Sequence, residues 1–145
     1  MSPLRRADLE RILGFVADTG ALEFDRPYPP ELLARLAGLV PCAAITYQEI
    51  DVRAQRFSLM VGPDGELDPD DEGDALYWAI GPCPIVSYRT RTADLGAARL
   101  SDVVARRAYR ELPIYRDYFA PFGVEHMLDL GLAAEAFYSR NSFAR

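Results

Sequence analysis

The sequence predicts an α+β domain in which one antiparallel sheet is flanked by helices. Apolar residues recur at helical spacing over residues 4–19 and 31–39, and the spacing changes to that of strands over residues 44–61. Residues 124–132 and 135–143 again have strand character. This order of helices, a hairpin, connecting helices and a second hairpin fits a single sheet with helical cover.

The first two helices are predicted from apolar stripes and from the residues that end them. Residues 4–19 carry an apolar stripe and are followed by Gly20. The prolines of residues 23–30 remove amide donors, so this segment is predicted as a loop. The second helix begins with Pro30 in its first turn and stops near Pro41.

The next segment has the period of strands. Residues 44–50 and 56–61 alternate on either side of a short polar turn, which predicts an antiparallel hairpin. Residues 62–74 are acidic, but their spacing fails the pattern of a calcium loop, so we expect a solvated loop. A short helix over residues 74–80 contains the only tryptophan, Trp78.

The middle of the chain is less regular. Residues 85–92 fit either a strand or a two-turn helix, and residues 98–104 are predicted as a short extended piece. Helices are predicted over residues 106–112 and 113–122. The two strands that follow would pair across residues 133–134.

Size and composition narrow the class of protein. The 145 residues are predicted to form a single domain, 1–145, with one hydrophobic core. The apolar runs are far shorter than the roughly 20 residues that a membrane span needs, and no signal peptide opens the chain, so we expect a cytoplasmic protein without a membrane partner. The net charge is -6, and the basic residues, all arginine, are mostly scattered. We therefore expect that the domain alone does not bind DNA.

Residues 100–132 are the most specific part of the sequence. Leu100-Ser101-Asp102 leads to the tyrosine-rich Pro113–Phe119 and then to Pro121–Leu128, closed by Leu130-Gly131-Leu132. With these residues the chain resembles the N-terminal, GAF-like sensor half of LuxR-type helix-turn-helix transcriptional regulators. The resemblance covers nearly the whole chain, most loosely at the N-terminus. It implies a sensory or dimerising domain followed by a linker and a DNA-binding module.

Two expectations about partners follow from this resemblance. The chain stops at Arg145 without a basic recognition helix, so DNA contact is expected only through a C-terminal module absent from the chain. Regulators of this type generally act on paired half-sites, which implies a homodimer. We expect the dimer to form through the first helix, whose polar face carries Arg5, Arg6, Glu10 and Arg11. The tryptophan, tyrosine and aspartate signature of the acylhomoserine-lactone branch does not align, so that ligand class is not predicted.

Aromatic residues define the predicted ligand pocket, which would lie between the sheet and residues 74–80 and 113–122. The expected walls are Tyr47, Trp78, Tyr88, Tyr115, Tyr118, Phe122 and His126. The expected ligand is an aromatic or amphipathic small molecule of little formal charge, because no arginine pair stands out in the sequence to hold an anion. The same rings would also suit an ordinary filled core.

Catalytic chemistry is not predicted. His126 is the single histidine, and strand alternation places it with Leu128 on the inward face. The same alternation places Glu125 and Asp129 together on a solvated polar face. The pair Ser101-Asp102 fits helix capping rather than catalysis.

The sequence offers no metal site and no cofactor site either. Cys42 and Cys83 are isolated and are expected to be small core residues. We therefore predict a non-enzymatic regulatory domain that binds an unidentified small molecule. The alternatives are a structural dimerisation domain without a ligand and a small α+β enzyme.

Overall fold

The computed structural model describes residues 3–25, 28–68, 71–132 and 138–144, the last of these by its backbone. Its strands are β1 (Ala44–Asp51), β2 (Arg56–Gly62), β3 (Gly65–Glu66), β4 (Ala98–Arg99), β5 (Met127–Leu132) and β6 (Tyr138–Ala144). They form one antiparallel sheet in the order β3-β2-β1-β6-β5-β4. The prediction of an α+β fold is confirmed.

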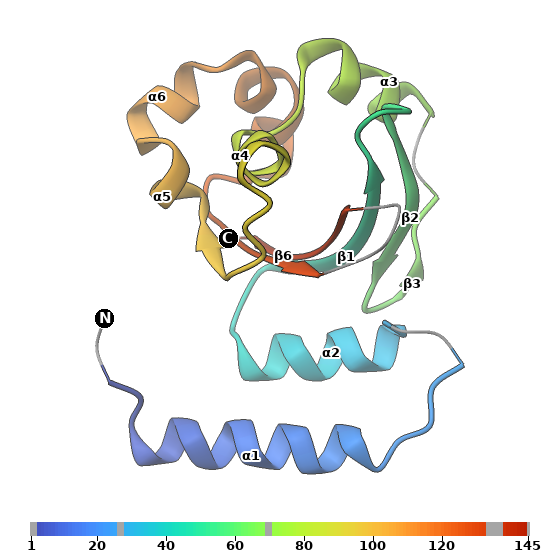
Figure 1. The fold of residues 1–145 in the computed structure, drawn as a ribbon, viewed down its shortest axis with the longest axis vertical. Coiled ribbons are helices and arrows are strands. Elements are labelled where there is room, and N and C mark those ends of the chain that lie inside the picture. The colour runs from blue at the N-terminus through green and yellow to red at the C-terminus, as the bar shows by residue number, and fades with distance from the viewer. Residues whose placement is uncertain (1–2, 26–27, 69–70, 133–137, 145) are drawn as a thin grey trace.

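Helices lie on both sides of the curved sheet. The helices α1 (Arg6–Gly20) and α2 (Pro30–Leu39) lie on its convex side (Figure 1). The other side is covered by α3 (Asp71–Ile80), α4 (Pro84–Thr92), α5 (Leu100–Val103), α6 (Arg106–Glu111), the π-helical turn η1 (Ile114–Phe119) and the 3-10 turn η2 (Ala120–Phe122). On the convex side α2 lies next to the sheet and α1 lies outside α2, so the sheet has helices on both faces (Figure 1).

Both predicted hairpin pairings are present. β1 pairs with β2, and β5 pairs with β6 from Met127 opposite Ala144 to Leu132 opposite Ser139. The connection predicted at residues 133–134 lies outside the described residues. β6 also pairs with β1 along its length, so the last strand of the sequence lies in the middle of the sheet.

Several segments differ in detail from the prediction. Within residues 62–74, predicted as a solvated loop, Gly65–Glu66 form β3 and pair with β2, and α3 already begins at Asp71. Residues 84–92 are helical, because Pro84 occupies the first turn and Ile85 and Val86 are buried there. The segment 98–104, predicted as extended, is a strand only at Ala98–Arg99 and then turns into α5. β5 begins at Met127, three residues later than predicted, because Gly123 at φ 69° first ends η2.

Two clusters of buried side chains hold the layers together. The larger one, between the sheet and the helices α3 to α6, includes Ile50, Phe57, Tyr77, Ile85, Val86, Leu100, Tyr109, Ile114, Phe119 and Met127. The smaller one, between the sheet and α2, consists of Leu33, Ile45, Tyr47 and Val61. Side chains from both sides of β1 are thus buried, as in a sheet covered on both faces.

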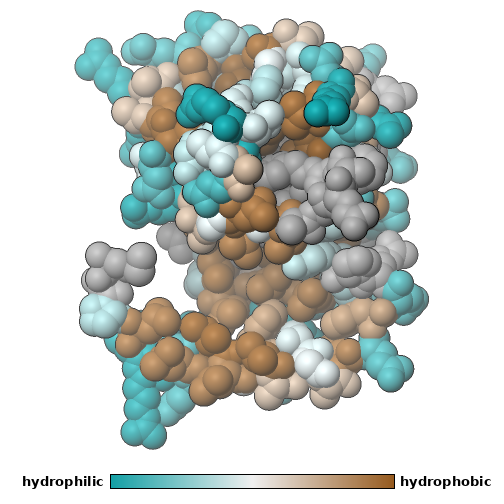
Figure 2. Space-filling model, in the orientation of Figure 1, coloured by the Kyte–Doolittle hydropathy of each residue, from teal (hydrophilic) through white to brown (hydrophobic). Residues whose placement is uncertain are grey.

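None of the side chains of the helix α1 is buried, although it is 15 residues long. It lies along α2, where Arg11 donates a hydrogen bond of 2.8 Å to the carbonyl oxygen of Gly38. Leu9, Leu13 and Val16 are 47%, 68% and 57% exposed. Figure 2 shows apolar surface along α1.

None of the helices that the structure describes combines the length and the apolar character needed to cross a bilayer.

Candidate functional site

A pocket of about 360 Å³ opens at the start of β5, between α5, α6 and the loop that joins α2 to β1. Its apolar walls are Val40, Pro41, Leu100, Val104, Met127 and Leu128, with the ring of Tyr109 and the thiol-bearing Cys42 beside them. Its polar residues are Arg99, Ser101, Arg106, Glu125 and His126. Apolar walls with a few polar groups are typical of small-molecule sites, and the volume lies at the lower end of their range.

Local sequence explains how α5 and α6 shape this pocket. The carboxylate of Asp102 accepts a hydrogen bond of 2.9 Å from the backbone N–H of Arg99, which caps the start of α5. Asp102 thus contributes to a cap, but from within α5, whereas the sequence placed it ahead of a helix. Leu100 and Tyr109 are 3% and 1% exposed and anchor α5 and α6 in the core. The polar residues of the two short helices are left at the pocket mouth.

A cluster of polar side chains stands at this mouth. It consists of Arg106, Arg110, Tyr115 and Glu125, and we call it the rim cluster. Arg106 Nη2 lies 2.5 Å from Glu125 Oε2. Arg110 Nη2 donates to Glu125 Oε1 at 2.6 Å and to Oε2 at 2.7 Å. The Tyr115 hydroxyl donates to Oε1 at 3.0 Å. Arg106 and Arg110 are four residues apart on α6, so both reach the same carboxylate.

The rim cluster sets the protonation state of Glu125. Hydrogen bonds from Arg106 and Arg110, with a further one from Tyr115, lower the pKa of Glu125 from 4.5 to about 2. The pKa of Tyr115 is raised by its burial and by its bond to this carboxylate. Glu125 is therefore ionised at neutral pH, and Tyr115 stays a hydrogen-bond donor.

The pairing of Arg106 and Arg110 on Glu125 differs from what the sequence indicated about arginine pairs. No arginine pair stood out there as a place to hold an anion, but the fold brings Arg106 and Arg110 together on one carboxylate. Two guanidinium groups facing one carboxylate leave one surplus positive charge at the pocket mouth. This surplus occurs in a chain whose net charge is -6. The helical spacing of Arg106 and Arg110 was a signal for the pair, but only the fold could show that Glu125 lies opposite.

The second carboxylate, Asp129, lies elsewhere. It is fully buried and forms an ion pair with Arg89 of α4, whose Nη2 lies 3.0 Å from Asp129 Oδ1. Arg89 also donates to the carbonyl oxygens of Asp129 and Asp94, at 3.1 and 2.6 Å. The prediction that Glu125 and Asp129 share a solvated face is wrong, because β5 starts only after Glu125 and turns Asp129 toward α4.

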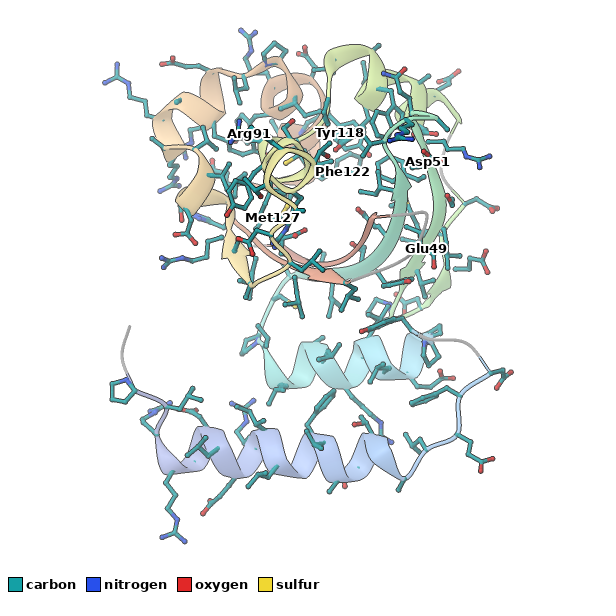
Figure 3. All side chains as sticks on the ribbon, in the orientation of Figure 1. Glu49, Asp51, Arg91, Tyr118, Phe122 and Met127 are labelled. Atoms are coloured by element: carbon teal, nitrogen blue, oxygen red, sulfur yellow. The ribbon has the colours of Figure 1, made fainter. Side chains whose placement is uncertain are left out.

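The predicted wall residues Trp78, Tyr118 and Phe122 gather at the other end of the helical layer, near α3 and β2. Trp78 packs on Phe57 and Tyr77 with ring centroids 5.7 and 5.1 Å apart, and Tyr118 lies 5.2 Å from Tyr77. Phe122 is 75% exposed, and with Tyr118 it borders a second hollow of about 500 Å³. Figure 3 labels Tyr118 and Phe122 on the side of α3 and Met127 on the side of β4.

The remaining predicted residues are dispersed. Tyr47 lies on the α2 side of the sheet, where it stacks on Tyr28 at 4.5 Å. Tyr88 donates a hydrogen bond of 2.6 Å to Asp94. Tyr115 belongs to the rim cluster. Only His126 lines the pocket at β5.

The environment of His126 differs from the prediction. The inward positions of β5 are Met127 and Asp129, so the predicted face assignment of His126 is wrong and its side chain is exposed. Cys83 is fully buried in the core, as predicted, whereas Cys42 is half-buried beside the pocket. Among the described residues, no three side chains of the types that bind metals come together.

The aromatic rings thus do not form one site. The described structure brings together pocket residues that the sequence analysis did not select, chiefly Arg99, Leu100, Val104, Arg106 and Met127. They come from four separate elements, β4, α5 with its C-cap, α6 and β5, so no local motif marked them.

The likeness of this chain to known proteins is one of fold. No model of a known protein family matches the chain. No curated protein sequence matches it either. Among solved structures, the fold is similar to that of the LBD (ligand-binding) domain of VqsR from Pseudomonas aeruginosa, with a TM-score of 0.59 at 12% sequence identity. The match covers 97% of this chain and 80% of the VqsR chain, so the likeness extends over nearly the whole fold.

Proposed function

We propose that this chain is the GAF-like sensor domain of a cytoplasmic LuxR-type transcriptional regulator, and that it binds a small molecule without catalysing a reaction. The likeness to the VqsR ligand-binding domain over 97% of the chain supports the regulatory assignment. The observation that carries the binding proposal is the pocket of about 360 Å³ at the start of β5, with its apolar walls and its ordered rim cluster.

The pocket at β5 is a better candidate than the aromatic region near α3. There the rings of Phe57, Tyr77, Trp78 and Tyr118 pack on one another, with neighbouring centroids 5.1 to 5.7 Å apart. Such contacts are those of a filled core. A hollow borders these rings as well, but the pocket at β5 has the ion-paired groups of the rim cluster, with fixed geometry, at its mouth.

The position of β6 supports control of a DNA-binding module. Ala144, at the end of β6, pairs with Ala44 on one side and with Met127, a pocket wall, on the other. A helix-turn-helix module joined after Arg145 would be attached beside the pocket. A ligand that favours one arrangement of this end of the sheet would then change the position of the module.

A second copy of the chain is the partner that α1 fits best. The charges predicted to pair across a dimer bind within the helix, since Arg5 contacts Asp8 at 3.1 Å and Arg6 contacts Glu10 at 2.8 Å. The apolar stripe of Leu9, Leu13 and Val16 remains exposed along the same helix. Burying it against its symmetry mate would remove these side chains from water.

Analytical ultracentrifugation tests the dimer. We expect a dimer at tens of micromolar, dissociated by Leu13→Glu and unchanged by Ala7→Glu on the opposite face of α1. A monomeric parent protein would contradict the proposal for this chain.

Native mass spectrometry of the purified protein, joined with a melting-temperature screen of small metabolites, tests ligand binding. Ser101→Trp places a bulky ring at the pocket mouth, whereas Ser87→Trp places one on the exposed side of α4. We expect a retained or added ligand to be lost only in Ser101→Trp. If the parent protein retains nothing and no compound raises its melting temperature, the alternative of a structural dimerisation domain is favoured.

A further inference from the structure

We infer that the ligand of the pocket at β5 is an amphipathic monoanion, with a carboxylate held by Arg106 and an apolar body between α5 and β5. This inference rests on the proposed function and specifies the chemistry of the same site. It replaces the ligand of little formal charge that the sequence favoured.

The pocket mouth carries more positive than negative charge. The rim cluster contains two guanidinium groups and one carboxylate, and the nearby Arg99 is already paired with Asp102 at 2.9 Å. One positive charge is therefore not matched by these carboxylates. A guanidinium group binds a carboxylate through charge-assisted hydrogen bonds that are stronger than neutral ones. A ligand with a single carboxylate would complete the balance.

Arg106 can bind a ligand carboxylate while Glu125 keeps its other hydrogen bonds. Arg110 reaches both oxygens of Glu125, and the Tyr115 hydroxyl reaches Oε1. Arg106 contributes one contact, to Oε2, and among the described residues only Glu125 accepts from it. Its side chain is 54% exposed and it lines the pocket. Its remaining N–H groups are therefore available to an incoming carboxylate.

The apolar walls of the pocket define the rest of the ligand. Leu100, Val104, Met127 and Leu128 form walls that an inorganic anion would leave in contact with water. An apolar body is needed to cover them. A cationic ligand is disfavoured because Glu125, the carboxylate that lines the pocket, is already engaged by both arginines. Arg106 fixes the charged end, and these walls receive the apolar end.

Isothermal titration calorimetry with decanoate, methyl decanoate and decylamine at pH 7, below the concentration at which any of them aggregates, tests the inference. These probes share a chain length and differ in charge. We expect decanoate to bind about tenfold or more tightly than the ester, since one charge-assisted contact is lost in the ester. We expect decylamine to bind more weakly than either. Raising the salt concentration should weaken the binding of decanoate but not that of the ester.

Variants on α6 provide the control. Arg106→Gln should lower decanoate affinity about tenfold and remove the difference between decanoate and the ester. Arg107→Gln should change neither, because Arg107 is 93% exposed and contacts only Glu111, at 3.8 Å, among the described residues. Melting curves of both variants identify any loss of fold.

The outcomes separate this inference from the proposed function. If the ester binds as tightly as decanoate and Ser101→Trp abolishes both, the pocket is a binding site but the anion inference is wrong. If decanoate binds equally well to the parent and to Arg106→Gln, the assigned role of Arg106 is wrong. If none of the three probes binds, the inference is overturned, and the proposed function is then decided by the retained-ligand measurement.

Discussion

Two carboxylates four residues apart in the sequence, Glu125 and Asp129, have opposite environments. Asp129 is fully buried against Arg89, which is also buried and which donates hydrogen bonds to two further backbone carbonyls. Glu125 lies at the pocket mouth, where one of its partners, Arg106, is 54% exposed. The first pair joins α4 to the sheet. The second is partly exposed to solvent.

This difference shows how burial changes the role of the same residue types. A buried guanidinium without its carboxylate has no water to replace it, so the partners are fixed in the folded protein. A partly exposed arginine can exchange one acceptor for another at small cost. The region around Arg89 is therefore structural, and the partly exposed rim cluster is where we propose that a ligand binds.

The largest expected effect is at the buried pair. Asp129→Ala should lower the free energy of unfolding by about 3–5 kcal/mol, because it leaves the buried charge of Arg89 uncompensated. Urea denaturation measures this loss. The double variant Arg89→Met/Asp129→Leu should recover part of it, since apolar residues of similar size often replace a buried ion pair without net loss. A loss for Asp129→Ala no larger than that for Asp102→Ala, in an exposed pair, would contradict the structural role.

The second effect is at Gly131, two residues further along β5. A Cβ atom built there would lie 2.9 Å from the Cα of Leu95, which cannot move as a flexible side chain would. Gly131→Ala should therefore destabilise the protein by about 1–3 kcal/mol. Gly14→Ala is the matched control, because nothing lies within 4 Å of its Cβ and alanine favours helix over glycine. Equal unfolding midpoints for the two variants would contradict close packing over β5.

The smallest effect is the pH dependence of the rim cluster. The pKa of Glu125 in the folded protein, about 2, lies below its ordinary value of 4.5, so the ionised form stabilises the fold. This contribution is complete above about pH 4.5 and is lost as the pH falls toward 2. The stability difference between the parent and Glu125→Gln should therefore shrink over this range. An NMR titration of the Glu125 carboxyl group should give a low pKa that Arg110→Gln raises toward the ordinary value.

The sequence predicted the fold better than the site. The helices of residues 4–19 and 31–39 and the hairpin of residues 44–61 were evident because periodicity and proline positions are local signals. The segment 85–92 was ambiguous because its helix is stabilised by Arg89 reaching a strand 40 residues later. Tertiary contacts of this kind leave no local pattern.

The site was missed for a related reason. The sequence directed attention to the rings of Trp78, Tyr118 and Phe122, because aromatic residues are visible in a sequence whatever they contact. The hollow at β5 is bounded by ordinary residues from α5, α6 and β5. The rim cluster at its mouth joins Arg106 and Glu125, which are 19 residues apart, and only the fold brings them together.

The two regions can be compared in a single NMR experiment with ¹³C-labelled methionine methyl groups. The chain has three methionines, of which Met127 lines the pocket at β5 and Met60 borders the second hollow near Tyr118 and Phe122. On addition of decanoate, or of any ligand found by native mass spectrometry, we expect the Met127 signal to shift and the Met60 signal to stay in place. A shift of Met60 with Met127 unchanged would contradict the account and would assign the ligand to the aromatic region.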